Sequence, residues 1–171
     1  MNQIHLHPSA LPVERLLAEC DTRRGRRRGP GGQHRNKVET AIVITHKPTG
    51  VKGEASERRS QEENRRAAVF RLRVNLALNV RTPRQESEMP SDLWQSRCRS
   101  GRISISNTHE DFPTLLAEAL DVLAACDMDI RSAAETLAVT ASQLIRFLKI
   151  APNAMAQVNK HRRKLGLHRL H

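Results

Sequence analysis

The chain has 171 residues with 29 Lys and Arg against 18 Asp and Glu, which gives a formal charge of +11 and a pI of about 10.9. This length allows one ordinary domain, or one small domain with a helical addition. The charge indicates a polyanionic partner. Aromatic residues make up only 2% of the chain, which argues against recognition of single-stranded bases by stacking and favours contact with phosphates.

The first 20 residues lack a basic start followed by an apolar stretch and carry Glu14 and Glu19, so we expect no secretory or transit peptide. No run approaches the roughly 20 apolar residues of a membrane helix. The three cysteines are widely spaced without a Cys-x-x-Cys pair, which predicts reduced thiols and neither a zinc site nor a disulfide framework. We therefore expect a cytoplasmic protein without a metal or cofactor.

Residues 11–19 favour a short helix with Pro12 in its first turn, and residues 20–28 begin a strand that runs into a cluster of arginines. Residues 38–46 are rich in β-branched side chains and predict a second strand. Pro48 and Gly50 are placed for a turn, and residues 51–55 then form the returning strand of a β-hairpin.

A long helix is predicted over residues 61–79, where Ser60-Gln61-Glu62-Glu63 reads as a capping box. Its apolar side chains form one line with two leucines beside it: Ala67, Phe70, Val74 and Leu78, then Leu72 and Leu76. We expect this helix to lie across the sheet. Its arginines then face either solvent or RNA, and both interpretations stay open: Arg65, Arg66, Arg71 and Arg73.

Residues 81–108 contain Pro83, Pro90, Gly101 and several serines, and we interpret them as a linker with a short strand at residues 103–105. Residues 108–111 (Thr-His-Glu-Asp) cap a further helix. Its apolar residues recur at helical spacing and predict one continuous buried face: Phe112, Leu115, Leu116, Ala119, Leu120, Leu123 and Ala124.

Residues 130–149 predict two short helices around a tight turn at Val139-Thr140, with Thr140 capping the second helix. Small alanines at the crossing resemble a helix-turn-helix, although many three-helix cores share this pattern without touching nucleic acid. Pro152 begins a last helix that ends in the basic run Lys160–Lys164. This run fits either contact with RNA phosphates or a solvated surface.

The most distinctive segment is Gly29-Pro30-Gly31-Gly32-Gln33, which follows five arginines at positions 23, 24 and 26–28. Gly31 and Gly32 let the backbone adopt positive φ and approach another molecule closely, and Pro30 stiffens the segment. Gln33 places a neutral amide at its end. Neither a Walker loop nor a Rossmann fingerprint is present. The residues predict an amide-tipped loop on a polyanion-binding arm.

These residues resemble the catalytic domain of class I peptide chain release factors and of the related ribosome-rescue peptidyl-tRNA hydrolases. The similarity continues through Asn36-Lys37, through Thr45-His46-Lys47-Pro48-Thr49-Gly50, and through Arg59-Ser60-Gln61 with Asn64-Arg65. Together with the element pattern, it implies an α+β fold in which a small sheet with a β-hairpin and a long packed helix carries the Gly-Gly-Gln loop. After it we expect an all-α C-terminal helical module, for which a helix-turn-helix is one interpretation. We expect a catalytic domain at 1–80, a linker at 81–108 and the helical module at 109–171.

The chain has no Ser/His/Asp set, Cys/His pair or metal-ligand spacing, so it does not read as a self-contained hydrolase. The resemblance implies that the large ribosomal subunit and the P-site peptidyl-tRNA supply most of the site, and that the protein inserts a catalytic tip. The implied catalytic residues are Gly31, Gly32 and Gln33. The implied rRNA- and tRNA-binding residues are Arg26, Arg27, Arg28, His34, Arg35, Asn36 and Lys37. Arg35 departs from the family, which has a small aliphatic residue there.

The resemblance implies codon-independent release of nascent peptide during translation termination or ribosome rescue, because the rest of the chain does not resemble codon-reading domains. One alternative is a non-catalytic ribosome- or RNA-binding factor with the same fold. A DNA-binding helix-turn-helix regulator is a third interpretation, but it leaves the first half of the chain unexplained. The partner of residues 109–171 stays open between tRNA, rRNA and a protein.

Overall fold

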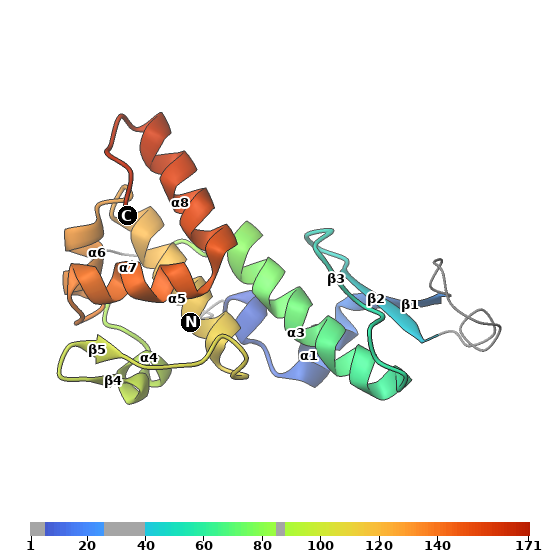
Figure 1. The fold of residues 1–171 in the computed structure, drawn as a ribbon. Helices are drawn as coiled ribbons and strands as arrows, with labels where there is room; N and C mark the ends of the chain where they lie inside the picture. The colour runs from blue at the N-terminus through green and yellow to red at the C-terminus, as the bar shows by residue number, and fades with distance from the viewer. Residues whose placement is uncertain (1–5, 26–39, 85–87) are drawn as a thin grey trace, which may run out of the picture. The chain divides into compact units, whose positions relative to one another are not determined.

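The computed structural model describes residues 6–25, 40–84 and 88–171. The chain divides into two compact units, residues 1–80 (the first unit) and 81–171 (the second unit). Helices predominate, and a small antiparallel sheet lies in the first unit (Figure 1). The predicted α+β class with C-terminal helices is confirmed. In the described ranges no helix is long and apolar enough to span a membrane.

The first unit begins with a short 3-10 helix at Pro8–Ala10 and helix α1 at Val13–Ala18. Its sheet contains β1 (Cys20–Gly25), β2 (Ala41–His46) and β3 (Lys52–Ala55) in that order. β2 and β3 form the predicted hairpin, with Ile42 paired to Ala55 and Thr45 to Lys52. Gly50 has a φ of +70° in the connecting turn, where a residue without Cβ is favoured.

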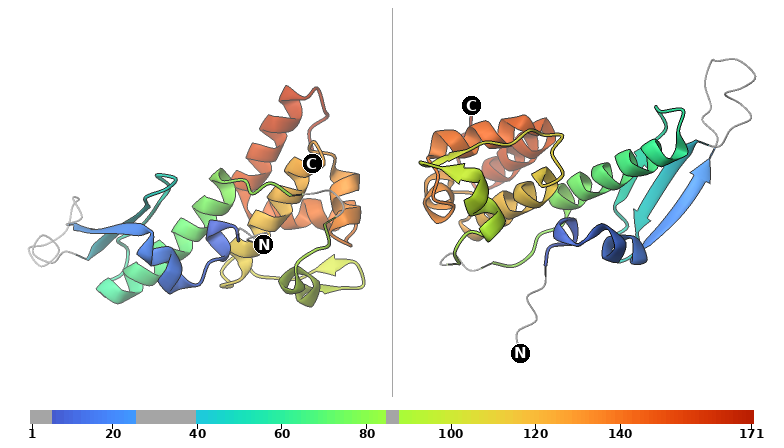
Figure 2. Two further views of the ribbon diagram at one scale, coloured as in Figure 1. Left: turned by 180° about the vertical axis from the view of Figure 1, so that it is seen from behind. Right: turned by 90° about the horizontal axis from the view of Figure 1, so that it is seen from below.

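Helix α3 spans Gln61–Asn79, as the sequence predicts, and lies along one face of the three-stranded sheet (Figure 2). The Ser60 hydroxyl accepts a hydrogen bond from the Glu63 backbone at 3.4 Å. Side chains alternate along β2, so that Ile42 and Ile44 face the helix and are buried. The core consists of Leu16, Ile42, Ile44, Ala55, Ala68, Val69, Leu72 and Leu76.

The predicted buried face of α3 is correct at Leu72, Leu76 and Leu78, but at the start of the helix the buried positions are shifted, to Asn64 and Ala68 from Ala67 and Phe70. Four fully buried positions, Asn64, Ala68, Leu72 and Leu76, lie four residues apart, and Ala77 is fully buried beside them. Phe70 and Val74 are only partly buried. The shift arises because a polar residue, Asn64, occupies the first buried position. A search for apolar periodicity alone passes over such a position.

The second unit contains α4 (Asp92–Arg97), the strand pair β4 (Cys98–Arg99) and β5 (Arg102–Ile103), then α5 (Phe112–Ala125), α6 (Ile130–Thr136), α7 (Ala141–Ile150) and α8 (Pro152–Lys164). Trp94 is fully buried. Its ring lies edge-on to Phe147 at 5.6 Å between centroids, and its Nε1 donates to the Leu137 carbonyl at 2.8 Å. Trp94 therefore joins α4 to the turn between α6 and α7.

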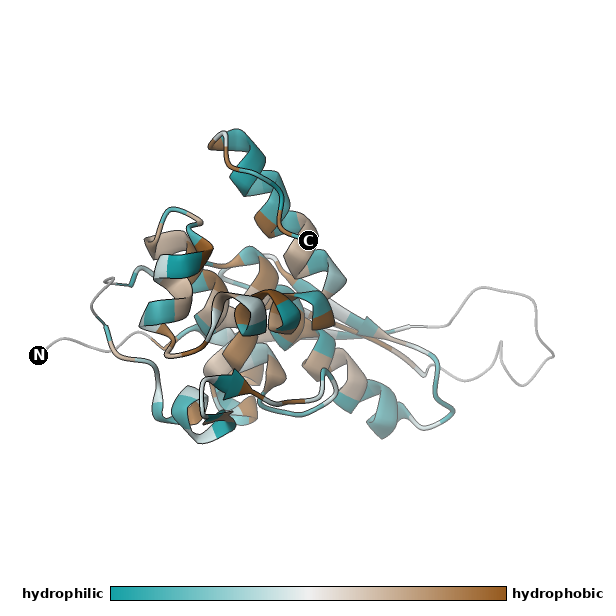
Figure 3. Ribbon diagram, turned by 60° about the vertical axis from the view of Figure 1, so that its left-hand side comes forward, coloured by the Kyte–Doolittle hydropathy of each residue, from teal (hydrophilic) through white to brown (hydrophobic). Residues whose placement is uncertain are grey.

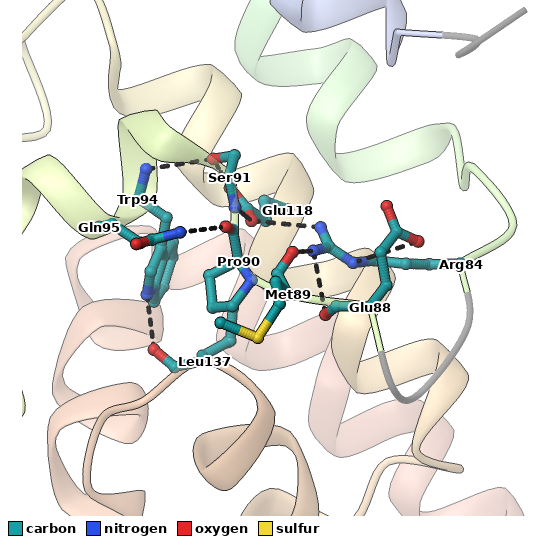
Figure 4. A network of polar contacts seen from close by, with 9 residues as sticks. All are labelled: Arg84, Glu88, Met89, Pro90, Ser91, Trp94, Gln95, Glu118 and Leu137. Atoms are coloured by element: carbon teal, nitrogen blue, oxygen red, sulfur yellow. Dashed lines mark hydrogen bonds and ion pairs between the residues drawn. The ribbon is translucent and has the colours of Figure 1, made fainter.

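Residues 81–108, expected to be a linker, instead contribute α4 and the β4–β5 pair to the second unit. Two carboxylates of α5 attach this segment, as Figure 4 shows for Glu118. Glu118 accepts from Arg84 at 3.1 Å and from the Ser91 backbone at 2.7 Å, and Asp121 accepts from Arg81 at 3.0 Å. The proline- and serine-rich composition did not indicate these pairings, which depend on residues more than 25 positions away.

Helix α5 is buried around most of its circumference rather than along one face. The buried residues include Ala117 and Val122 as well as the predicted positions except Ala124, which is only partly buried. Its predicted cap also differs. Residue Asp111 occupies the N-cap without a side-chain cap hydrogen bond, because its carboxylate pairs with Arg97 at 2.5 Å. The cap of α7 is as predicted, with the Thr140 hydroxyl accepting from the Gln143 backbone at 3.2 Å.

Candidate functional site

The predicted catalytic residues Gly31, Gly32 and Gln33 lie outside the described residues. The same holds for the predicted RNA-binding residues Arg26, Arg27, Arg28, His34, Arg35, Asn36 and Lys37. The structure does describe what carries this segment on either side, namely β1, β2, the loop after β3 and the start of α3. We refer to residues 26–39 as the Gly-Gly-Gln segment.

The two strands that flank the Gly-Gly-Gln segment are direct neighbours in the sheet. β1 pairs with β2 in antiparallel register from Cys20 opposite His46 to Gly25 opposite Ala41. The chain therefore leaves the sheet and returns to it at adjacent positions on one end. An antiparallel pair continuing over six residues holds these two points at a fixed separation.

Asn64 fixes the returning end of this segment. Its side chain is completely buried, and its Nδ2 donates to the carbonyl oxygens of Thr40 at 2.7 Å and Arg58 at 2.9 Å. Its Oδ1 accepts from the Arg58 backbone at 2.9 Å. A buried amide needs such partners. Here they join the residue after the Gly-Gly-Gln segment to the first turn of α3.

A second buried polar side chain, His46, connects neighbouring elements at the opposite end of β2. The His46 ring is 1% exposed, and its nitrogens lie 2.7 Å from the Thr49 hydroxyl and 3.1 Å from the Glu19 carboxylate. It therefore connects β2 to the hairpin turn and to the residue that ends α1. The motif from Thr45 to Gly50 thus has a structural role in the described fold.

Gly53 permits the close packing of the sheet against α3. A Cβ at this residue would lie 2.2 Å from the Ala68 carbonyl oxygen and 2.4 Å from the Leu72 nitrogen. Both atoms belong to the helix backbone and cannot rotate away. The sequence analysis did not single out Gly53, because a lone glycine in a strand indicates a close approach but not which residues approach it.

Several exposed arginines lie at the end of the sheet that carries the Gly-Gly-Gln segment. Arg23 and Arg24 are on β1, an edge strand. Arg58 and Arg59 follow β3, and Arg65 follows Asn64 on α3. In the described part of the chain, the ion pairs of this region join Arg66 to Glu62 and Arg71 to Glu57 instead. The hydrogen bond from Arg71 lowers the pKa of the Glu57 carboxyl. The five arginines supply positive charge around the segment that favours phosphate contact.

The described residues contain no group of three or more His, Cys, Asp or Glu side chains arranged to hold a metal ion. The three cysteines are free thiols, and burial raises the pKa of both Cys20 and Cys98. The Cys20 and Cys98 thiols are therefore protonated at neutral pH and are poor nucleophiles.

The family model of the RF-1 domain, the Gly-Gly-Gln domain of class I release factors, matches residues 16–112. Since this is more than half of the chain, the protein belongs to the RF-1 domain family. Members of this family hydrolyse peptidyl-tRNA and act on the ribosome, which supports a release-factor-like role in general. No solved structure matches the chain.

Proposed function

We propose that the protein is a ribosome-dependent peptidyl-tRNA hydrolase that releases the nascent peptide without reading a codon. The observation that carries this proposal is the RF-1 domain match over residues 16–112, within which Gly31-Gly32-Gln33 is intact. A factor that only bound the ribosome would not need this triplet. Because the proposed target is the translating ribosome, we expect the protein to act in the cytoplasm.

The proposed chemistry is attack of water on the ester that joins the peptide to the tRNA. Such a reaction needs an oriented water and donors directed at the charge that develops on oxygen. We assign the stabilisation of that charge, or of the leaving 3′-oxygen, to the backbone N–H of Gln33. The side-chain amide of Gln33 then positions water and excludes larger nucleophiles. Gly31 and Gly32 leave room for the rRNA.

The contacts at the two ends of the Gly-Gly-Gln segment fit a catalytic tip that must enter the ribosomal site in one orientation. The ends of the segment are held by the Gly25–Ala41 pair and by the hydrogen bond from Asn64 to Thr40. A fixed base reduces the number of orientations in which Gln33 can arrive at the ester, and misplacement by about 1 Å can cost 100-fold in rate. The exposed arginines around this base would bind rRNA phosphates.

Codon independence is proposed because residues 81–171 show no resemblance to codon-reading domains. The test is peptide release from purified ribosomes that carry peptidyl-tRNA and either a truncated mRNA or a stop codon in the A site. We expect release from the truncated complexes without a stop codon. Release only with a stop codon would contradict codon independence while leaving hydrolysis intact.

The catalytic assignment is tested by Gln33→Ala and Gly32→Ala in the same assay. Each substitution should lower the release rate by at least about 100-fold, the scale for losing one preorganised charge-stabilising contact. Gln157→Ala, on α8, is the matched control and should release peptide at the wild-type rate. Full release by both variants would remove the catalytic assignment. Ribosome binding by the wild type without any release would indicate the non-catalytic binding factor instead.

A further inference from the structure

The second unit contains an open groove of about 870 Å³ formed by the end of α7, one side of α8 and the segment after α8. Five basic residues line it: Lys149, Lys160, Arg163, His168 and Arg169. Apolar residues also line it, among them Pro152, Met155 and Leu167. We call it the basic groove. It involves no residue of the Gly-Gly-Gln segment or of the first unit.

The wall of the basic groove formed by residues 165–171 is built into the fold. At the end of α8, the Leu167 and Gly166 backbone N–H groups donate to the Arg162 and Arg163 carbonyls at 2.8 and 3.1 Å. With Gly166 at a φ of +73°, this is a Schellman ending. It reverses the chain, so that the following residues return along α8.

Two side chains of α8 then hold the returning segment in place. Asn159 pairs with both backbone groups of Leu170, accepting from its nitrogen at 2.8 Å and donating to its oxygen at 3.1 Å. Arg162 is 8% exposed and donates to the carbonyls of His168 and Met128. Arg162 therefore fits neither of the two alternatives left open for residues 160–164, RNA contact or a solvated surface, because its guanidinium is buried and donates to backbone carbonyls within the unit. The hydrogen bonds of Asn159 and Arg162 hold residues 168–170 in place, and so position His168 and Arg169 beside the groove.

The charge of the basic groove is unopposed. Residues 136–171 contain no Asp or Glu, and Figure 3 shows that most of α8 is hydrophilic. Lys149, Lys160, Arg163 and Arg169 are all exposed. Among the described residues, no ion pair joins any of these four to a carboxylate. Clustered cations without counter-charges repel one another, and a bound polyanion relieves this repulsion.

We infer that the basic groove is a second RNA-binding site, which contacts the sugar-phosphate backbone of a folded RNA. Arginine and lysine side chains around a hollow suit phosphates. No Phe, Trp or Tyr lines the groove, so bases have no aromatic surface on which to stack and recognition does not depend on sequence. RNA is the polyanion that an RF-1 family member meets on the ribosome. The inference rests on this membership and not on hydrolysis by Gln33.

The test measures binding of the full chain to fluorescein-labelled RNA hairpins of two unrelated sequences, by fluorescence anisotropy over a range of KCl concentrations. The groove variant combines Lys160→Ala, Arg163→Ala and Arg169→Ala. The control variant removes the same charge from exposed residues of the second unit outside the groove, with Arg99→Ala, Arg102→Ala and Arg131→Ala. Peptide release is not needed for this readout, so failure here and failure of the proposed hydrolysis are distinguishable.

We expect the groove variant to bind both hairpins at least about tenfold more weakly at 0.1 M KCl, with a salt dependence that is less steep by roughly 2–3 in log–log slope. The control variant should keep the wild-type slope. Equal losses in both variants, or no loss in either, would overturn the inference. Should the groove variant unfold at a lower temperature, Lys149→Gln with Lys160→Gln replaces it, since both side chains are exposed.

A parallel measurement uses vesicles of phosphatidylcholine with phosphatidylserine, because an anionic membrane also attracts clustered cations. Wild-type binding to the vesicles that is weak and insensitive to the groove variant supports RNA as the ligand. Loss of vesicle binding in the groove variant, with RNA binding unchanged, would overturn the inference.

Discussion

The side-chain amide of Asn64 donates to the carbonyl oxygen of Thr40, 2.7 Å away. This bond connects the first turn of α3 to the residue directly after the Gly-Gly-Gln segment. The same side chain makes two further hydrogen bonds with the backbone of Arg58. One buried amide therefore joins three separate parts of the chain at the end of the sheet where β1 ends and β2 begins.

Replacing Asn64 should affect both stability and peptide release. Asn64→Ala leaves three backbone groups, of Thr40 and Arg58, without their partner, and each unsatisfied group costs about 1 kcal/mol or more. We expect the free energy of unfolding of the first unit to fall by about 3 kcal/mol, measured by urea titration with far-UV circular dichroism. We also expect the release rate on saturated ribosomes to fall at a temperature where the variant is folded.

The control is Asn75→Ala on the same helix. Asn75 also donates to a strand carbonyl, that of Lys52 at 2.7 Å, but at an exposed site near the hairpin turn. It should cost about 1 kcal/mol or less and leave the release rate of the folded protein unchanged. An Asn64→Ala variant that folds and releases peptide at the wild-type rate would show that Asn64 is structural only.

Gly53 should tolerate no side chain. In Gly53→Ala the new methyl group would lie within 2.2–2.7 Å of the backbone of Ala68 and Leu72. Strand β3 or α3 must then move, and we expect a cost of about 3 kcal/mol or more. Thermal unfolding followed by circular dichroism measures this loss.

Two other glycines calibrate the prediction for Gly53. Gly50 has a φ of +70° with open space around its Cβ position, so Gly50→Ala should cost about 1 kcal/mol. Gly25 has open space and no positive φ, so Gly25→Ala should change stability by less than about 0.5 kcal/mol. Equal effects at all three positions would refute close packing as the reason for Gly53.

The sequence was sufficient for elements whose signal is local. These elements are α3, the hairpin turn at Gly50 and strand β2. They follow from propensity, capping and turn residues that lie within a few positions of each other. The contacts of Glu118 and Asp121 with residues 81–91 are not local. Two carboxylates within the mostly apolar α5 were the available sign that charged residues from elsewhere pack against this helix.

The candidate site also has a part that the sequence predicts and a part that depends on the fold. Its identity was readable from the Gly-Gly-Gln triplet and the ordered motifs after it. The roles of Asn64, His46 and Gly53 were not, because each depends on which atoms the fold brings near: a strand carbonyl, a helix-end carboxylate and a helix backbone. A polar or small residue in a buried position carries no information about its partner until the register is known.

The turn between α6 and α7 contains a strained residue that glycine should relieve. Ala138 is exposed and has a φ of +53°, a left-handed conformation that costs an L-residue roughly 1 kcal/mol. Ala138→Gly should raise the free energy of unfolding of the second unit by about 0.5–1 kcal/mol. Trp94, the only tryptophan, bonds to the adjacent Leu137 and reports this transition by fluorescence.

The control for Ala138 is Ala156→Gly in the exposed interior of α8, which should lower stability by about 1 kcal/mol. The opposite signs expected for two Ala-to-Gly changes separate backbone strain from a general effect of glycine. A loss of stability in Ala138→Gly would show that the left-handed residue costs nothing in the native turn.

Asp121 should make the stability of the second unit depend on pH. Its side chain is buried on α5, and burial raises the pKa of its carboxyl from 3.8 to about 6, although Arg81 acts in the opposite direction. Between these two pH values the folded carboxyl keeps its proton while the unfolded one has lost it. The folded state is thus favoured at low pH, and this contribution is lost as the pH rises through 6.

The variant Asp121→Asn isolates this contribution, because asparagine has the same shape and does not titrate. Between pH 5 and pH 7.5 the wild type should lose about 1 kcal/mol of unfolding free energy relative to Asp121→Asn, the amount that follows from a folded pKa near 6. Urea titrations at the two pH values, followed by Trp94 fluorescence, measure the difference. The difference between the unfolding free energies of the wild type and the variant at each pH cancels the contributions of the other titrating groups. Parallel pH dependence in the two proteins would mean that the Asp121 carboxyl is ionised throughout this range, with Arg81 offsetting the cost of its burial.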